Sequence, residues 1–129
     1  MHRTFLLLGS LFGALAVALG ALGAHKIKEV ASADVLAAYH TGVQYQMYHA
    51  LALLLVGIVY DRISNKWINA AGYLFVCGII FFSGSLYLIT ALTIAGKTIS
   101  PWLGAITPLG GLFFICGWLC FLAGLLRTK

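Results

Sequence analysis

Four long apolar runs occupy almost the whole chain and decide what it can fold into. They cover residues 5–24, 43–60, 68–92 and 101–126. About 20 apolar residues cross a hydrocarbon core about 30 Å thick, and each run has roughly that length or more. Only 9% of the 129 residues are charged, against roughly 25% in soluble domains. The sequence therefore predicts an all-α integral membrane protein, a single domain over residues 1–129 built as an antiparallel four-helix bundle.

The first run resembles a signal peptide at its start, because a short basic end precedes it. It is longer than the usual apolar region of such a peptide, however, and carries glycines at helix-packing spacing. We expect it to be retained as a span.

The segment from His25 to Gly42 is polar and mixed in character. Ser32 and Asp34 are suitable N-caps, and a short apolar stretch follows them. This pattern predicts a short amphipathic helix in the membrane interface, between the first and second spans.

The formal net charge of +5 comes from Lys and Arg residues that lie between or outside the apolar runs. Such residues anchor spans at lipid headgroups, so we expect membrane lipids and no nucleic acid as partners. The two termini and the Asp61–Lys66 turn share one side and hold five of the eight basic residues. The positive-inside rule therefore predicts a multi-pass membrane protein with both termini in the cytoplasm.

Small residues recur within the spans and predict close helix packing. A stripe in the first run could pack inside the bundle, or serve a homo-oligomer or a larger membrane-protein partner. The predicted packing positions are Gly9, Gly13, Gly20, Gly84, Gly110 and Gly111.

Polar residues from all four spans are expected at one level, in the half of the bundle away from the termini, when depth is counted at about 1.5 Å per residue. Tyr45, Tyr48 and His49 share one broad helix face, whereas Gln46 points elsewhere, toward the interface. Pro108 frees the carbonyl of Gly104, which neighbouring hydroxyls could satisfy. The predicted cluster comprises His25, Tyr45, Gln46, Tyr48, His49, Ser83, Ser85, Tyr87, Thr107 and Pro108.

Two interpretations of this cluster stay open. Its members could join the helices through interhelical hydrogen bonds, or they could bind a lipid, a small ligand or a partner membrane subunit. The alternative function is a small oligomeric transporter or channel, in which His49 and Tyr45 line a proton or solute path. His49 is the strongest candidate for a functional residue, because it is the only ionisable residue other than Tyr and Cys well inside a span.

Catalytic and metal chemistry are not expected. Buried carboxylates that would orient a histidine are missing from the spans, so we predict no enzyme and no catalytic residues. The histidines lack a tight metal-binding spacing, and the three cysteines lie in apolar surroundings where thiols are common. We expect no metal and no cofactor.

Four stretches resemble the motifs of the domain of unknown function 423 family. They are "GALGAH" from Gly20, "TGVQYQMYHALALL" from Thr41, "FSGSLY" from Phe82 and "TPLGG" from Thr107. The resemblance extends over essentially the whole chain and implies a small four-span bacterial inner-membrane protein with no established biochemical role. It points at Gly23, Ala24, His25, Gln46, His49, Ser83, Gly84, Ser85, Tyr87, Pro108, Gly110 and Gly111.

Overall fold

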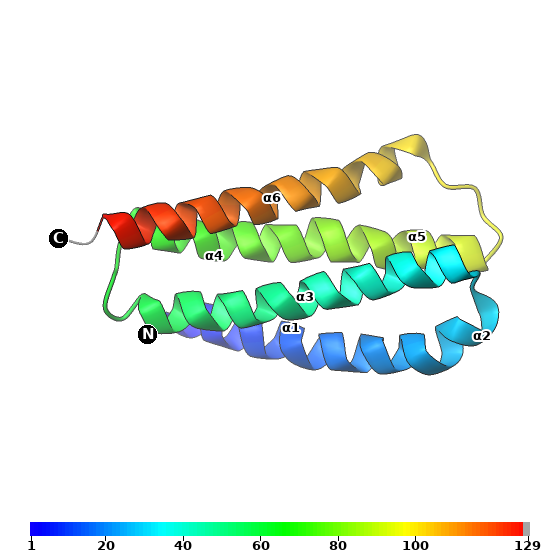
Figure 1. The fold of residues 1–129 in the computed structure, drawn as a ribbon, viewed down its shortest axis with the longest axis horizontal. Helices are drawn as coiled ribbons and strands as arrows, with labels where there is room; N and C mark the ends of the chain where they lie inside the picture. The colour runs from blue at the N-terminus through cyan, green and yellow to red at the C-terminus, as the bar shows by residue number, and fades with distance from the viewer. Residues whose placement is uncertain (128–129) are drawn as a thin grey trace.

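The computed structural model describes residues 1–127, and these residues form a bundle of four long helical rods. Each rod is long and apolar enough to cross a membrane, which confirms the predicted four-helix architecture. The rods run alternately up and down, so the start of the first rod, the end of the fourth rod and the turn between the second and third rods lie at the same end (Figure 1). The elements are α1 (Arg3–Leu22), a π-helical segment (Gly23–Ile27), α2 (Lys28–Val30), α3 (Ala33–Val59), α4 (Lys66–Gly78), a second π-helical segment (Ile79–Ser83), α5 (Gly84–Ile94) and α6 (Pro101–Leu126).

The prediction of a separate interfacial helix between the first two spans is wrong. The Ser32 hydroxyl accepts a hydrogen bond from the Val35 amide at 3.4 Å and so caps α3, which then continues without interruption past Val43. Helix propagation adds one hydrogen bond for each residue fixed, and the polar residues of this segment do not stop it. The apparent separate helix is the first part of the second rod, and the first rod likewise continues to Val30.

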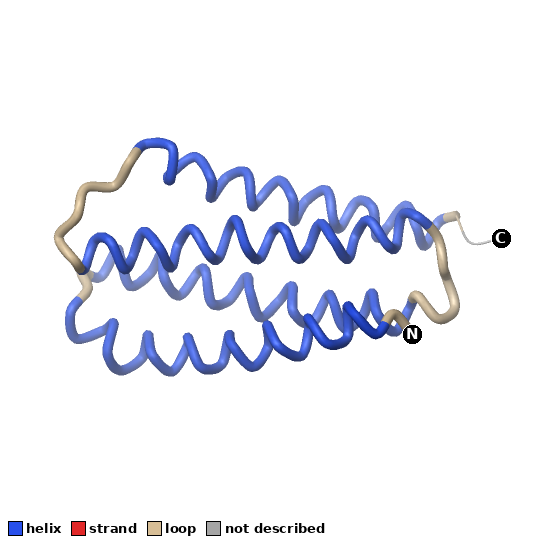
Figure 2. Tube along the Cα trace, turned by 180° about the vertical axis from the view of Figure 1, so that it is seen from behind, coloured by secondary structure: helices blue, strands red, loops and turns tan. Residues whose placement is uncertain are grey.

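The four rods form two helical hairpins, which we call the N-hairpin (residues 3–59) and the C-hairpin (residues 66–126). Within each hairpin the two rods pack closely, and the hairpins meet mainly where α3 lies against α4, the second π-helical segment and α5. Loops occur only at the two ends of the bundle (Figure 2). In the second and third rods, 44% and 33% of the residues in an apolar 18-residue stretch are buried. The shares in the first and fourth rods are 17% and 22%. The second and third rods are therefore central, and α1 and α6 lie at the periphery.

The apolar core fills the half of the bundle that carries the termini, which we call the termini end. Phe5, Leu53, Val56, Ile68 and Phe75 are fully buried there. Large apolar side chains elsewhere on all four rods are exposed, as expected for surfaces that face lipid rather than water.

One ion pair lies at the surface of the termini end. The Met1 ammonium is 2.6 Å from the Asp61 carboxylate, and both side chains are about two-thirds exposed. The hydrogen bond and the positive charge of the terminal amine lower the pKa of Asp61 below its ordinary value of 3.8. This contact joins the start of the N-hairpin to the turn that leads into the C-hairpin.

We expect the ion pair to give a small acid dependence of stability. Because the pKa of Asp61 is lower in the folded state, its contribution is present above the unfolded pKa and is lost as the pH falls through the folded value. Thermal unfolding midpoints, measured in detergent between about pH 2.5 and pH 7, should show this loss in the wild type and a flatter acid limb in Asp61→Asn. Identical acid limbs would contradict it.

Candidate functional site

The predicted polar residues do not form one cluster but fall into three places. Five of them make a hydrogen-bonded set in the half away from the termini end, which we call the hydroxyl network: Gln46, Ser83, Ser85, Tyr87 and Thr107. His49 and Tyr45 lie near the middle of the 27-residue helix α3, beside aromatic residues of α6. His25, Tyr48 and Pro108 are exposed on the outside of the bundle.

Gln46 lies in the core rather than at the interface, which corrects the sequence prediction. It is only 3% exposed. Its Nε2 donates to the Phe12 carbonyl at 2.9 Å, and its Oε1 accepts from the Tyr87 hydroxyl at 2.7 Å. Gln46 is four residues after Gly42 and three before His49, so all three share the buried face of α3. This one side chain thereby joins α1, α3 and α5.

The serines complete the hydroxyl network. Ser83 is fully buried in the second π-helical segment and donates to the Gly42 carbonyl at 2.6 Å. Ser85 donates to the Phe82 carbonyl at 2.9 Å, and its oxygen lies 2.6 Å from that of Thr107 on α6. With Tyr87 bound to Gln46, every hydroxyl of the network has a partner within the chain.

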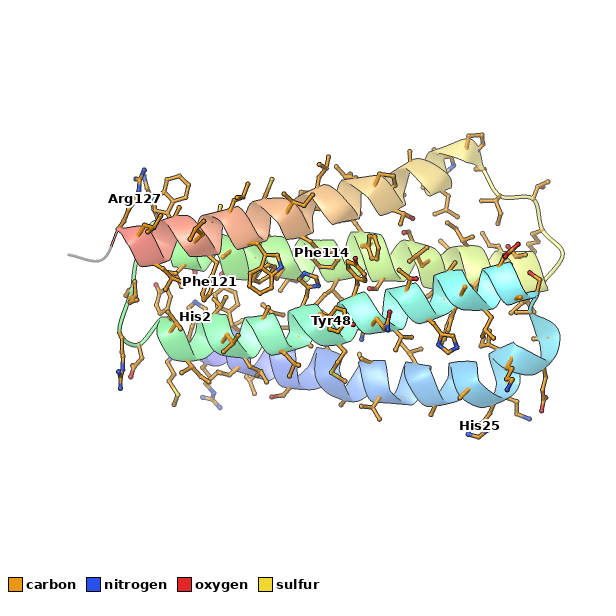
Figure 3. The ribbon with its side chains drawn as sticks, viewed as in Figure 1. His2, His25, Tyr48, Phe114, Phe121 and Arg127 are labelled. Atoms are coloured by element: carbon orange, nitrogen blue, oxygen red, sulfur yellow. The ribbon has the colours of Figure 1, made fainter. Side chains whose placement is uncertain are left out.

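Pro108 does not recruit these hydroxyls. We expected the carbonyl of Gly104 to bond to Ser83, Tyr87 or Thr107, but each of these has the different partner just described. Pro108 itself is exposed. His25 is also exposed, and Figure 3 shows it on the outer side of the first rod, away from the other helices. Neither residue contributes to the network.

His49 is held by two hydrogen bonds and a stacked ring. The Trp118 indole nitrogen lies 3.1 Å from Nε2, and the Tyr45 carbonyl lies 2.7 Å from Nδ1. An indole only donates, so Nε2 accepts and Nδ1 carries the proton that it donates to Tyr45. The ring stacks on Phe114 at a centroid distance of 3.6 Å. These contacts fit a neutral imidazole with both nitrogens engaged.

A groove of about 360 Å³ lies beside His49, between α3 and α6. Tyr45 is 39% exposed there, and its hydroxyl forms no hydrogen bond to any residue in the described range 1–127. We call this feature the His49 groove, and its lining residues are Tyr45, His49, Phe82, Gly111, Phe114, Ile115 and Trp118. The aromatic members from α6 were missed by the sequence reasoning, because aromatic residues in an apolar run are typical of lipid-facing positions.

The glycines differ in what surrounds them. A Cβ at Gly9 would lie 2.9 Å from the Ala50 carbonyl oxygen, and one at Gly20 would touch Val43 at 3.4 Å. A Cβ at Gly110 would collide with the backbone of Phe82. A Cβ at Gly111 would make an ordinary van der Waals contact with the Phe82 ring at 3.9 Å. Nothing lies within 4 Å of a Cβ at the two remaining predicted positions, Gly13 and Gly84. Among residues 1–127, those two positions are therefore not points of close helix contact.

Metal-binding groups do not gather in the part of the chain that the structure describes. No three His, Cys, Asp or Glu side chains between residues 1 and 127 lie close enough together to share an ion. The His49 groove is the cavity that adjoins the histidine of the second rod, and we take it as the candidate site.

Comparisons with known proteins agree with this membrane architecture. A family model described as "Protein of unknown function (DUF423)" matches residues 19–111. The UPF0382 membrane protein YwdK of Bacillus subtilis is 44% identical over 118 residues, which cover 91% of each chain. The UPF0382 inner membrane protein YgdD of Escherichia coli is 33% identical over 127 residues, which cover 98% of this chain and 92% of that protein. No solved structure matches. The chain therefore belongs to the DUF423 family, also called UPF0382, of multi-span inner-membrane proteins.

Proposed function

We propose that the protein is a non-enzymatic membrane protein that binds an apolar molecule of the bilayer, a lipid or another small ligand, in the His49 groove. The observation that carries this proposal is the groove itself, with its volume of about 360 Å³ and its aromatic walls. The unpartnered hydroxyl of Tyr45 supports a ligand with a hydrogen-bond acceptor, since a hydroxyl in hydrocarbon is costly to leave unbonded.

The hydroxyl network gives less support for a ligand site. Its side chains bond to one another or to backbone carbonyls of the bundle. A ligand would have to replace bonds that already exist, whereas the His49 groove offers the exposed ring of Tyr45. The network fits the role of joining helices.

A transport path through His49 receives little support. Both ring nitrogens of His49 are engaged, and the buried residues between it and the termini end are apolar, including Leu53, Val56, Phe75 and Phe5. A proton or a polar solute would therefore meet mainly buried apolar side chains along that part of the core.

Gly111 offers a direct test of the His49 groove. A Cβ at Gly111 meets only the Phe82 ring, at 3.9 Å, so Gly111→Leu should fill the groove without displacing backbone. Gly104→Leu is the matched control, because it makes the same change on the same helix where nothing lies within 4 Å of a Cβ. Native mass spectrometry of protein extracted in mild detergent would count the bound molecules.

We expect wild type and Gly104→Leu to retain a bound apolar molecule, and Gly111→Leu to lose at least about tenfold in occupancy, since a ligand cannot share the filled space. Wild-type protein that carries nothing, or equal occupancy in the two variants, would contradict the proposal. Circular dichroism of both variants checks that the helices are intact.

A further inference from the structure

Two cations flank one tryptophan at the termini end. The guanidinium carbon of Arg127 lies 4.8 Å from the Trp67 ring centroid, and the ammonium nitrogen of Lys66 lies 5.7 Å from it. Figure 3 shows Arg127 where the last turn of α6 ends, beside the start of α4. Cation–π attraction holds cations near an aromatic face at such distances. Two positive charges are thus gathered at one point of the bundle end.

Among residues 1–127, no carboxylate forms an ion pair with Lys66 or Arg127. Within residues 1–127 the one ion pair joins the Met1 ammonium to Asp61, so the sole acidic residue of this end is already engaged. Arg3 and Arg62 add further positive charge at the same end. A pair of neighbouring cations without a counterion favours an anion from outside the chain.

Hydrogen bonds fix the elements that carry the two cations. The Asn65 Oδ1 accepts from the Trp67 and Ile68 amides at 3.0 Å and caps α4, and its Nδ2 donates to the Gly124 carbonyl on α6 at 3.0 Å. The lack of a side chain at Gly124 lets Ile68 pack directly on α6. The start of α4 and the end of α6 are therefore held together before any ligand arrives, which lowers the entropic cost of binding.

An apolar cavity adjoins the cations. It has a volume of about 400 Å³ and is lined by Lys66, Trp67, Ala70 and Cys120. The indole nitrogen of Trp67 is buried and has no hydrogen-bond acceptor within the described residues, although a buried indole N–H usually has one. Positive charge and apolar volume thus occur side by side at the termini end.

We propose that this arrangement is a binding site for an anionic phospholipid, with its phosphate held by Lys66 and Arg127 and an acyl chain in the cavity beside Trp67 and Ala70. Basic pockets between spans bind such headgroups where the helices reach the membrane surface. A zwitterionic lipid would bring a cation close to Arg127 and Lys66 and bind less tightly. The site does not depend on the proposed role of the His49 groove.

The test uses purified full-length protein in detergent, titrated with phosphatidylglycerol or with phosphatidylcholine of the same acyl chains and followed by native mass spectrometry. The double variant Lys66→Gln/Arg127→Gln removes the two cations beside Trp67. The control double variant Arg3→Gln/Arg62→Gln removes the same charge from the same end. Ala70→Leu keeps both cations and fills the cavity.

We expect wild type and the control to bind phosphatidylglycerol about tenfold more tightly than phosphatidylcholine, from the attraction of two cations for one phosphate. The Lys66/Arg127 variant should lose this preference, and Ala70→Leu should weaken binding of both lipids. Equal losses in the two double variants would show attraction to general surface charge and overturn the site. Displacement of phosphatidylglycerol by an equal concentration of inorganic phosphate would show that the cations take free phosphate instead of lipid.

Discussion

Replacing Gly110 with alanine should destabilise the bundle more than any other small substitution that we consider. A Cβ at this position would overlap the Phe82 backbone, with the Phe82 Cα only 2.6 Å away, so either α6 or the second π-helical segment must shift. Overpacking of a close contact costs about 1–3 kcal/mol, and backbone relaxes less readily than a side chain end. We expect a loss of that order for Gly110→Ala, measured by unfolding in mixed micelles with rising SDS.

Gly104→Ala is the matched control for this prediction. It lies on the same helix, but nothing lies within 4 Å of its Cβ. Since alanine has a higher helix propensity than glycine in an isolated helix, the control should be neutral or slightly stabilising. If both variants unfold at the same SDS fraction, the contact between α6 and Phe82 does not limit stability.

Replacing Gln46 with leucine should have the second largest effect. The change removes the bond to the Phe12 carbonyl and leaves the partly buried Tyr87 hydroxyl without its acceptor. A polar group left unsatisfied away from water costs about 1–3 kcal/mol. The free energy of unfolding of Gln46→Leu should fall by that amount in the same micelle assay.

A double-mutant cycle with Tyr87→Phe isolates the bond between the two side chains. Once Gln46 is leucine, the Tyr87 hydroxyl has lost its acceptor, so its removal should cost less or even stabilise the bundle. We expect a coupling free energy of about 0.6–2 kcal/mol, the range for interhelical hydrogen bonds in membranes. Additive effects of the two substitutions would mean that the 2.7 Å contact contributes nothing to stability.

The architecture could be predicted from the sequence because membrane spans are encoded by length and apolarity alone. The beginning of α3 could not be predicted in this way, because the apolar run begins only near Val43, whereas the Ser32 cap starts the helix at Ala33. That difference moves His49 from the edge of a span to the middle of a helix. The predicted common level of His49 and the serines failed for this reason.

Gln46 shows a different kind of error. Its position three residues before His49 places the two on one face, and this spacing was visible in the sequence. The predicted helix face was instead centred on Tyr45, Tyr48 and His49, and that choice left Gln46 outside it. The second π-helical segment was not foreseeable in the same way, since Ile79–Ser83 carries no Pro or Gly that would mark it. The groove walls on α6 were hidden because lipid-facing and groove-lining aromatic residues look alike in sequence.

The contacts between the two hairpins include directional hydrogen bonds, and this has a consequence for how the chain assembles. Within each hairpin, small residues such as Gly9 and Gly117 meet large side chains directly. Between the hairpins, directional bonds operate: Tyr87 to Gln46, Ser83 to Gly42 and Trp118 to His49. We expect each hairpin to enter the bilayer as a pair of spans before the two hairpins associate. The hydrogen bonds between the hairpins then favour one relative orientation. A wrong rotation of one hairpin against the other would leave these groups unpaired in hydrocarbon.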